Sequence, residues 1–315
     1  MIASATDTAP SPLQVAAARY RIEPRPAGFD FDGFARKQAD WLGEARRLGA
    51  RLAVLPEYLS LELAAAFAPA VHADLGASLE AIQSLHAPWM RLFTRLAGEL
   101  DMHVVAGSFL LATGDGRYRN RSYRFAPDGG HDWQDKLQLT GFEKQLVGDG
   151  IGLIEPGDAL GVYPVDGVRA GTAVCYDSEF PLPVRAQREA GMRVLVVPSC
   201  TDTEAGATRV RIGCLARALE NRCFVVQSVT AGEAPWSPAL DRNTGEAAVY
   251  APMDVGLPAD GVLATTRGDA RWAVAALDFA ALDATRAQAQ VANDRDWPGQ
   301  HAPAIVRAKL VGTRP

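Results

Sequence analysis

The sequence predicts an α/β protein built as a four-layer α-β-β-α sandwich, with two packed mixed sheets between outer helices. Two stretches of the chain are similar: residues 49–57 read Gly-Ala-Arg-Leu-Ala-Val-Leu-Pro-Glu, and residues 191–199 read Gly-Met-Arg-Val-Leu-Val-Val-Pro-Ser. Each follows a helical pattern and precedes a second helix, and these second helices lead into two further similar strands, 99–108 and 220–228. Nearly continuous apolar strands between helices indicate sheets buried on both faces. Two such helix-strand-helix-strand units can therefore pack sheet against sheet.

Hydrophobic spacing defines the elements of the first unit. Residues 13–20 predict a strand, and residues 31–48 place apolar side chains at helical spacing. Gly49 stands where the C-cap of that helix belongs. The unit continues with a strand at 51–55, an amphipathic helix at 78–100 that we expect Pro88 to interrupt, and a strand at 104–111.

A hairpin and a strand that ends in a cysteine lie between the two units. Residues 122–126 and 131–137 flank the turn signal Pro-Asp-Gly-Gly, and Lys136 lies near the end of the second strand. Residues 169–175 are apolar and β-prone up to Cys175, and polar residues and prolines follow immediately. This pattern predicts a strand that runs into a sharp corner. Beyond the second unit we expect short strands within 231–270, a core strand at 272–277 and a helix at 282–290.

Length and composition are those of a globular domain with a large core. The 315 residues are 48% hydrophobic and 22% charged, and α/β folds often use this much chain as one domain. We expect residues 1–12 to be a disordered lead-in and residues 13–280 to form the domain. Residues 281–315 then form a C-terminal extension that can pack on a partner subunit.

Charge and hydropathy argue against several classes of partner. The net charge of −5 argues against nucleic acid or an anionic membrane surface as the main partner. No apolar run reaches the ~18 residues of a membrane helix, and the first residues lack the basic start and apolar core of a secretory signal. These features favour a cytoplasmic protein.

The cysteines and histidines show no pattern typical of a metal site. The four cysteines have no Cys-x-x-Cys spacing, which favours reduced thiols in a cytoplasm. The five histidines are scattered without metal-ligand spacing. The chain also lacks a Gly-x-Ser-x-Gly elbow and a phosphate-binding loop. We therefore expect neither a metal nor a cofactor.

Three chemically active residues stand at the ends of predicted strands: Glu57, Lys136 and Cys175. A cysteine thiol is only a few per cent ionised at neutral pH, so it needs a proton acceptor such as Glu57. A lysine ammonium can stabilise a thiolate and the oxyanion that forms when sulfur adds to a carbonyl. The backbone N–H of Tyr176, after the cysteine, is a natural second oxyanion donor. Glu143 can hold the lysine or position the leaving group.

These residues together resemble the signature of the nitrilase superfamily of carbon–nitrogen hydrolases. The motifs are Leu-Pro-Glu57, then Lys136-x-x-Leu-x-x-x-Glu143, then Cys175-Tyr-Asp-x-x-Phe-Pro. Pro-Ser199 and Ala216-Arg-Ala-Leu-Glu-Asn match motifs further along, so the resemblance covers about residues 13–280. The resemblance implies the same four-layer fold in a homodimer or higher homo-oligomer.

The resemblance also implies the roles of the site residues. Glu57 is the general base, Lys136 the oxyanion stabiliser, Cys175 the nucleophile and Glu143 a supporting acid. Cys-Tyr-Asp is similar to the amidase-type branches, whereas true nitrilases tend to have Cys-Trp-Glu. The implied activity is cleavage of a small carboxamide through a cysteine thioester, with release of ammonia or an amine.

Three other functions stay open at this point. A nitrilase or an N-carbamoyl hydrolase would use the same residues. A redox-sensing protein would use the Cys175 thiol alone, and a non-catalytic scaffold would use none of these residues. Many members of the family have Ser-Ala-Trp where this chain has Ser199-Cys200-Thr201, so the walls of the substrate pocket do not follow from the resemblance.

Overall fold

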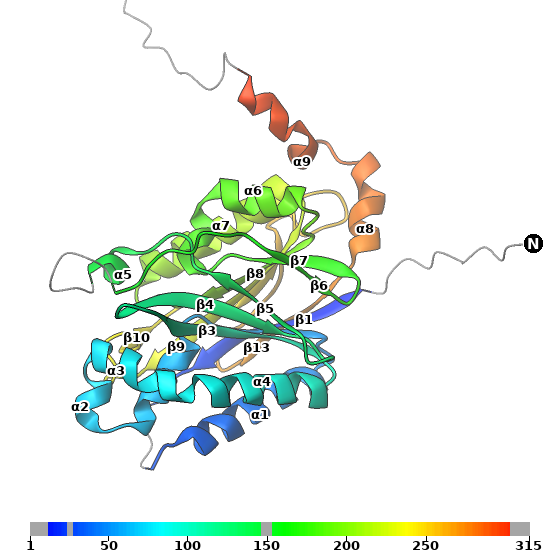
Figure 1. Cartoon of the computed structure of the whole chain (residues 1–315). Coiled ribbons are helices and arrows are strands. Elements are labelled where there is room, and N and C mark those ends of the chain that lie inside the picture. Colours follow the sequence, from blue (N-terminus) through cyan, green and yellow to red (C-terminus); the bar gives the residue numbers. More distant parts are fainter. Residues whose placement is uncertain (1–11, 24–27, 146–152, 303–315) are drawn as a thin grey trace, which may run out of the picture.

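The computed structural model describes residues 12–23, 28–145 and 153–302. It confirms a mixed α/β fold (Figure 1). All but one residue of the predicted lead-in at 1–12 lies outside the described residues. No helix in the described ranges is long and apolar enough to cross a membrane.

Nine strands form one continuous hydrogen-bonded path in the order β5-β4-β3-β2-β1-β9-β8-β7-β6. Their bounds are, in that order, His131–Asp135, Arg117–Phe125, His103–Gly114, Leu52–Leu55, Leu13–Arg21, Phe224–Glu233, Val194–Ser199, Val168–Thr172 and Val162–Val165. The strands off this path are β10 (Arg242–Asn243), β11 (Ala248–Tyr250), β12 (Val262–Thr265) and β13 (Trp272–Leu277). The hairpin of β4 and β5 and the core strand β13 confirm the corresponding predictions.

Strand β1 joins the two halves of this path. Its first residues pair in parallel with β2 and antiparallel with β13, with Leu13 opposite Leu277. Its last residues, Arg19 to Arg21, pair in parallel with β9 instead. The sequence predicts two sheets but gives no sign of this shared strand, because β1 is apolar along most of its length.

Helices cover the two halves from opposite sides (Figure 1). Helices α1 (Phe31–Arg47) and α4 (His86–Glu99) bury their aromatic side chains in one apolar core with β1 to β4. Helix α7 (Glu204–Asn221) packs over β8 and β9 in a second core, and α6 (Pro181–Glu189) lies on the same side. A third core joins strands of both halves, including Val54 and Val105 from one and Val196 and Val226 from the other.

The long helix predicted at 78–100 is broken, but not where we expect. The chain forms η1 (Leu59–Ala66), α2 (Pro69–His72), α3 (Leu75–Ile82) and η2 (Gln83–Leu85) before α4 begins at His86. Pro88 is therefore the third residue of α4, inside its first turn. A proline is tolerated there because an N–H in the first turn has no partner within the helix. The prediction of a break at Pro88 is wrong by a few residues.

The two units repeat each other in backbone conformation as well as in sequence. After α1 and α6, Gly49 and Gly191 have φ of 90° and 92°. After α4 and α7, Asp101 and Arg222 have φ of 46° and 45°. All four lie in the left-handed region that commonly ends a helix. The similarity read from the sequence is therefore a structural repeat.

The described part of the C-terminal extension packs on this same chain. It contains α8 (Phe279–Ala284), η4 (Thr285–Ala287), α9 (Asn293–Asp296) and η5 (Trp297–His301). The predicted helix at 282–290 begins earlier, at Phe279, because the Asp278 carboxylate accepts the Ala281 N–H and caps it. It also ends earlier than predicted, since residues 288–290 follow η4 and are not helical. Asp294 then forms an ion pair with Arg188 of α6 at 3.2 Å. Packing on a partner subunit stays a prediction.

Candidate active site

Glu57 follows β2 at the carboxyl ends of the parallel strands, where its carboxylate is buried. Its Oε1 accepts hydrogen bonds from Lys136 Nζ and Asn120 Nδ2, both at 2.8 Å. Its Oε2 accepts the Cys200 N–H at 3.1 Å. The Glu57 carboxylate thus receives donors from both halves of the molecule, since Asn120 lies on β4 and Cys200 follows β8.

Lys136 follows β5 and lies between two carboxylates. Its Nζ is 2.8 Å from Glu57 Oε1 and 2.8 Å from Glu143 Oε2, and none of the three side chains is more than 1% exposed. Glu143 belongs to the short helix α5 (Gly141–Gln145) and also accepts the Tyr58 hydroxyl at 2.8 Å. Buried charges of this kind persist only when they are paired and hydrogen-bonded.

Cys175 lies at the corner that the sequence predicts. Strand β7 ends at Thr172, and Cys175 begins the helix η3 (Cys175–Glu179) with φ of +49°. A residue other than glycine in this region is strained, and such strain persists only where the surroundings impose it. The thiol is buried and donates weakly to the Cys200 carbonyl at 3.6 Å. The corner therefore presents the sulfur beside the Glu57 carboxylate.

Asp177 ties the cysteine corner to the lysine loop. Its carboxylate accepts the backbone N–H of Val174 at 3.0 Å, of Leu137 at 3.1 Å and of Gln138 at 2.7 Å. One buried carboxylate thereby fixes the positions of Cys175 and Lys136 relative to each other. Helix α7 supports the corner from behind, because a Cβ at Gly213 would lie 2.9 Å from the Ser178 carbonyl oxygen.

Burial and neighbouring charges shift the pKa values of the two carboxylates, Glu57 and Glu143, in opposite directions. Burial raises the pKa of Glu57, and the lowering by Lys136 does not cancel burial and the nearby Glu143 together. Glu143 is also buried, but Lys136 and several hydrogen bonds hold its pKa below the usual value. Two carboxylates whose pKa values are pushed apart are typical of an acid–base site. Glu143 is therefore the permanent counter-charge of Lys136, and Glu57 is the carboxylate that can exchange a proton.

The resting thiol is protonated. Burial raises the pKa of Cys175 well above its usual value, and Glu57 raises it further against the lowering by Lys136. Lys136 favours the thiolate, as the sequence predicts, but its lowering of the pKa is smaller than the rise caused by burial. The nucleophile must lose its proton at the moment of attack.

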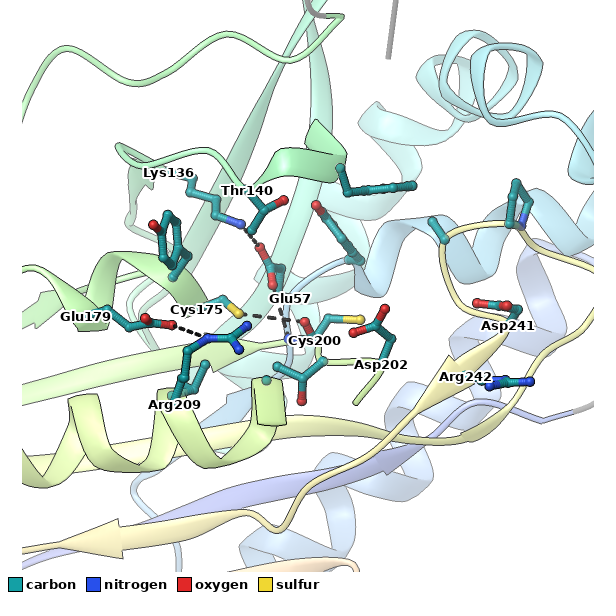
Figure 2. A pocket seen from close by; sticks show the side chains of 18 residues that line it. Glu57, Lys136, Thr140, Cys175, Glu179, Cys200, Asp202, Arg209, Asp241 and Arg242 are labelled. Atoms are coloured by element: carbon teal, nitrogen blue, oxygen red, sulfur yellow. Dashed lines mark hydrogen bonds and ion pairs between the residues drawn. The ribbon is translucent and has the colours of Figure 1, made fainter. Parts of the chain in front are cut away.

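These residues surround a cavity of about 230 Å³ (Figure 2). Glu57, Lys136 and Cys175 lie in its wall, together with Tyr176 and the aromatic side chains of Tyr58 and Phe142. Charged side chains at other parts of the wall are Glu179, Asp202, Arg209, Asp241 and Arg242. Figure 2 shows Arg209 next to Glu179, on the side of the cavity near Cys175; the two side chains approach to 3.6 Å.

All the site residues predicted from the sequence meet here, with Glu143 behind Lys136. Asn120, Asp177 and Tyr58 also belong to the site, although they were not predicted from the sequence. Asn120 had a usable signal, because Arg117, Arg119 and Arg121 alternate with Tyr118, Asn120 and Ser122 along β4. Residues two apart share a face of a strand, so the three arginines on one face place Asn120 on the buried one.

Within the described ranges, no group of three or more His, Cys, Asp or Glu side chains is arranged to hold a metal ion.

Two curated relatives give the class of this protein. The chain is 28% identical over 255 residues to "Probable hydrolase YhcX" of Bacillus subtilis, a match that covers 81% of this chain and 47% of that protein. It is 31% identical over 225 residues to "Hydrolase Rv0480c" of Mycobacterium tuberculosis, which covers 69% of this chain and 71% of the relative. The chain thus spans about half the length of the first relative. Both relatives are named as hydrolases.

The family is narrower than this class. Residues 14–259 match the family described as Carbon-nitrogen hydrolase. The chain therefore belongs to the carbon–nitrogen hydrolase family, whose members are hydrolases acting on carbon–nitrogen bonds. Its fold is also that of an amidase of the nitrilase superfamily from Nesterenkonia AN1, with a TM-score of 0.64 at 21% identity, covering 91% of this chain and 97% of the other. The resemblance to the nitrilase superfamily is confirmed.

Proposed function

We propose that this protein cleaves the amide bond of a small carboxamide through a thioester on Cys175 and releases ammonia or an amine. The observation that carries the proposal is that a buried carboxylate, a buried ammonium and a strained cysteine border one cavity. Each of these groups costs stability where it lies. Nucleophilic acyl transfer uses all three.

The first half of the reaction forms the thioester. Glu57 takes the thiol proton as the sulfur attacks the carbonyl carbon, the C–S bond forms, and the carbonyl oxygen becomes an oxyanion. Lys136 has three N–H donors, two of which are engaged by Glu57 and Glu143. The third is available to the oxyanion, with the Tyr176 N–H as the second donor. Glu57 then gives its proton to the nitrogen as the C–N bond breaks.

In the second half of the reaction, Glu57 activates a water molecule that hydrolyses the thioester. Glu57, ionised again after the amine leaves, removes a proton from a water molecule that attacks the thioester carbonyl. The C–S bond then breaks, and the proton returns from Glu57 to the sulfur. The carboxylic acid leaves, and the raised pKa of Glu57 suits a group that accepts and donates a proton twice in each cycle.

The alternative functions would form different intermediates on Cys175 or would use different residues of the site. A nitrile would give a thioimidate and an N-carbamoyl substrate a carbamoyl thioester, both on Cys175. The amidase fold of the solved neighbour and the Cys-Tyr-Asp corner support the amide over these two. A redox-sensing thiol would leave the buried Glu57, Lys136 and Glu143 without a purpose.

A substrate comparison tests the proposal directly. The protein is incubated with an amide, a nitrile and an N-carbamoyl compound of matched acyl chain, and ammonia and acid are measured. We expect turnover of the amide, loss of turnover in Cys175→Ala, and a covalent acyl adduct on Cys175 detected by mass spectrometry. Turnover of the nitrile alone, or activity that survives Cys175→Ala, would refute the proposal.

We also infer how the sheets and helices are arranged in layers. The three separate cores support a four-layer α-β-β-α arrangement, with the core shared by both halves as its centre. Assembly into a homodimer remains an expectation from the family, and a cytoplasmic location remains an expectation from the sequence. Analytical ultracentrifugation of the full chain tests the first of these.

A further inference from the structure

Asn120 lies in a closed ring of hydrogen bonds at the centre of the site. Its Nδ2 donates to Glu57 Oε1 at 2.8 Å and to Glu143 Oε1 at 3.2 Å. Lys136 Nζ bridges the same two carboxylates at 2.8 Å each. Two carboxylates thus share two bridges, one charged and one neutral.

The orientation of the Asn120 amide follows from these partners. An amide carries two N–H donors on one side and an acceptor oxygen on the other. The reverse orientation would place the amide oxygen against two carboxylate oxygens, so the nitrogen must face them. In the part of the chain that the structure describes, the buried Asn120 Oδ1 has no hydrogen-bond partner. A buried acceptor left unpaired is costly and calls for an explanation.

The two oxygens of Glu57 are occupied unequally. A carboxylate oxygen has two lone pairs, and both lone pairs of Oε1 are engaged by Lys136 and Asn120. Oε2 accepts a single N–H, from Cys200, which leaves one lone pair for a proton. Cys175 and this carboxylate are near enough to influence each other's pKa, and Figure 2 shows Glu57 between Lys136 and Cys175.

We propose that Asn120 is a positioning residue which, with Lys136, occupies Glu57 Oε1 and so restricts proton exchange with the substrate and Cys175 to Oε2. This inference rests on the proposed function of Glu57 as the base. A neutral amide suits the task because it fixes one oxygen without adding a second positive charge, which would make Glu57 too weak a base. The cost of the unpaired Oδ1 is thereby explained.

The pH dependence of the site follows from this arrangement. The Asn120 donor stabilises the ionised carboxylates, so its loss raises the pH at which the pair takes up a proton. The titratable and charged groups that face Glu57 from the surrounding elements are Lys136, Glu143, Tyr58, Cys175 and Cys200. None of these is altered when Asn120 is replaced, and the carboxylates titrate as a coupled pair.

The test compares Asn120→Ala with Ser122→Ala. Ser122 lies two residues along β4 on the same buried face, and its hydroxyl has no hydrogen-bond partner among the described residues. We expect the acid limb of the pH profile of kcat/KM for an amide to move up by about one pH unit in N120A, the scale of one lost hydrogen bond to a carboxylate. The S122A profile should match that of the wild type. If N120A folds poorly, as judged by thermal melting, Asn120→Ser, whose hydroxyl is too short to bridge both carboxylates, gives the same shift.

A second measurement separates this inference from the proposed function. The rate of Cys175 alkylation by iodoacetamide is measured against pH in the same variants, which requires no amide turnover. The inference predicts the same upward shift in N120A and N120S. A wild type that cleaves no amide would refute the proposed function but leave this measurement valid. A slower N120A enzyme whose two pH profiles coincide with those of the wild type would overturn the positioning role.

Discussion

The two repeated units share a backbone plan but only one of them carries the charged chemistry. At equivalent positions after Leu-Pro and Val-Pro stand Glu57 and Ser199. Glu57 is at the centre of the ring of buried polar groups, whereas the Ser199 hydroxyl donates to Val197 of its own strand at 3.2 Å. The next N–H, on Cys200, donates to Glu57. The repeat therefore provides two similar strand ends, and the site arises where one supplies a carboxylate and the other a backbone donor.

The sharpest test of this difference replaces the two equivalent residues. Glu57→Gln should lower kcat/KM for an amide by at least about 10³-fold, because the variant loses the carboxylate that takes the thiol proton. Ser199→Ala should keep the value within about threefold of the wild type, since it removes one hydroxyl that bonds only its own strand. Steady-state kinetics at saturating and limiting amide measure both. Equal losses in the two variants would mean that the strand ends act mainly as scaffold.

A second test compares the left-handed residues Asp101 and Arg222, which share a backbone conformation. Arg222 forms an ion pair with Asp254, and both side chains are less than 10% exposed. Arg222→Gly relieves backbone strain but leaves Asp254 buried without its partner, so we expect the free energy of unfolding to fall by about 3–5 kcal/mol. Asp101 is 64% exposed where it meets Arg51, and surface pairs of this kind contribute little. Asp101→Gly should therefore leave stability unchanged or raise it by up to about 1 kcal/mol.

Urea denaturation of both glycine variants measures these changes. A stability loss in D101G as large as in R222G would contradict the assignment of the difference to the buried ion pair. A stable R222G would show that Asp254 finds another partner.

The smallest expected difference between equivalent positions is that between Gly49 and Gly191. Both have φ close to +90°, which is unfavourable for alanine. A Cβ at Gly49 has nothing within 4 Å, and at Gly191 it meets the flexible end of Arg169. Gly49→Ala and Gly191→Ala should therefore each lower the free energy of unfolding by a similar amount, about 1–2 kcal/mol. Thermal melts of the two variants check this, and a clear inequality would show that the two helix ends are not equivalent.

Site residues could be predicted from the sequence where a charged or reactive residue stands at the end of a predicted strand. Glu57 and Cys175 are visible because a charged or reactive group ends an apolar strand, and Lys136 because it ends the second strand of a predicted hairpin. The repeat is visible because glycine and a short apolar strand recur with the same spacing. The main helices and strands follow from hydrophobic period. The short elements η1, α2, α5 and β6 were not predicted, and the break near residues 83–85 depends on how the segment after η1 packs.

The remaining features depend on contacts between distant segments. Asn120 and Asp177 read as ordinary polar residues, and their roles come from partners 23 to 63 residues away for Asn120 and 39 and 40 residues away for Asp177. The raised pKa of Cys175 comes first from burial of the thiol and then from the nearby Glu57. The sequence contains all of these groups but does not show which of them lie close enough in space to shift each other's pKa.

Strand β1 has a consequence for how the protein is made. It is synthesised long before one of its partners, β13, since Leu13 lies opposite Leu277. At synthesis rates of about 5–20 residues per second, roughly 10–50 seconds pass before β13 has been added to the chain. During this interval β1 has an unpaired edge and an apolar surface, which favour aggregation. The nascent chain thus needs protection at β1 until β13 has left the ribosome.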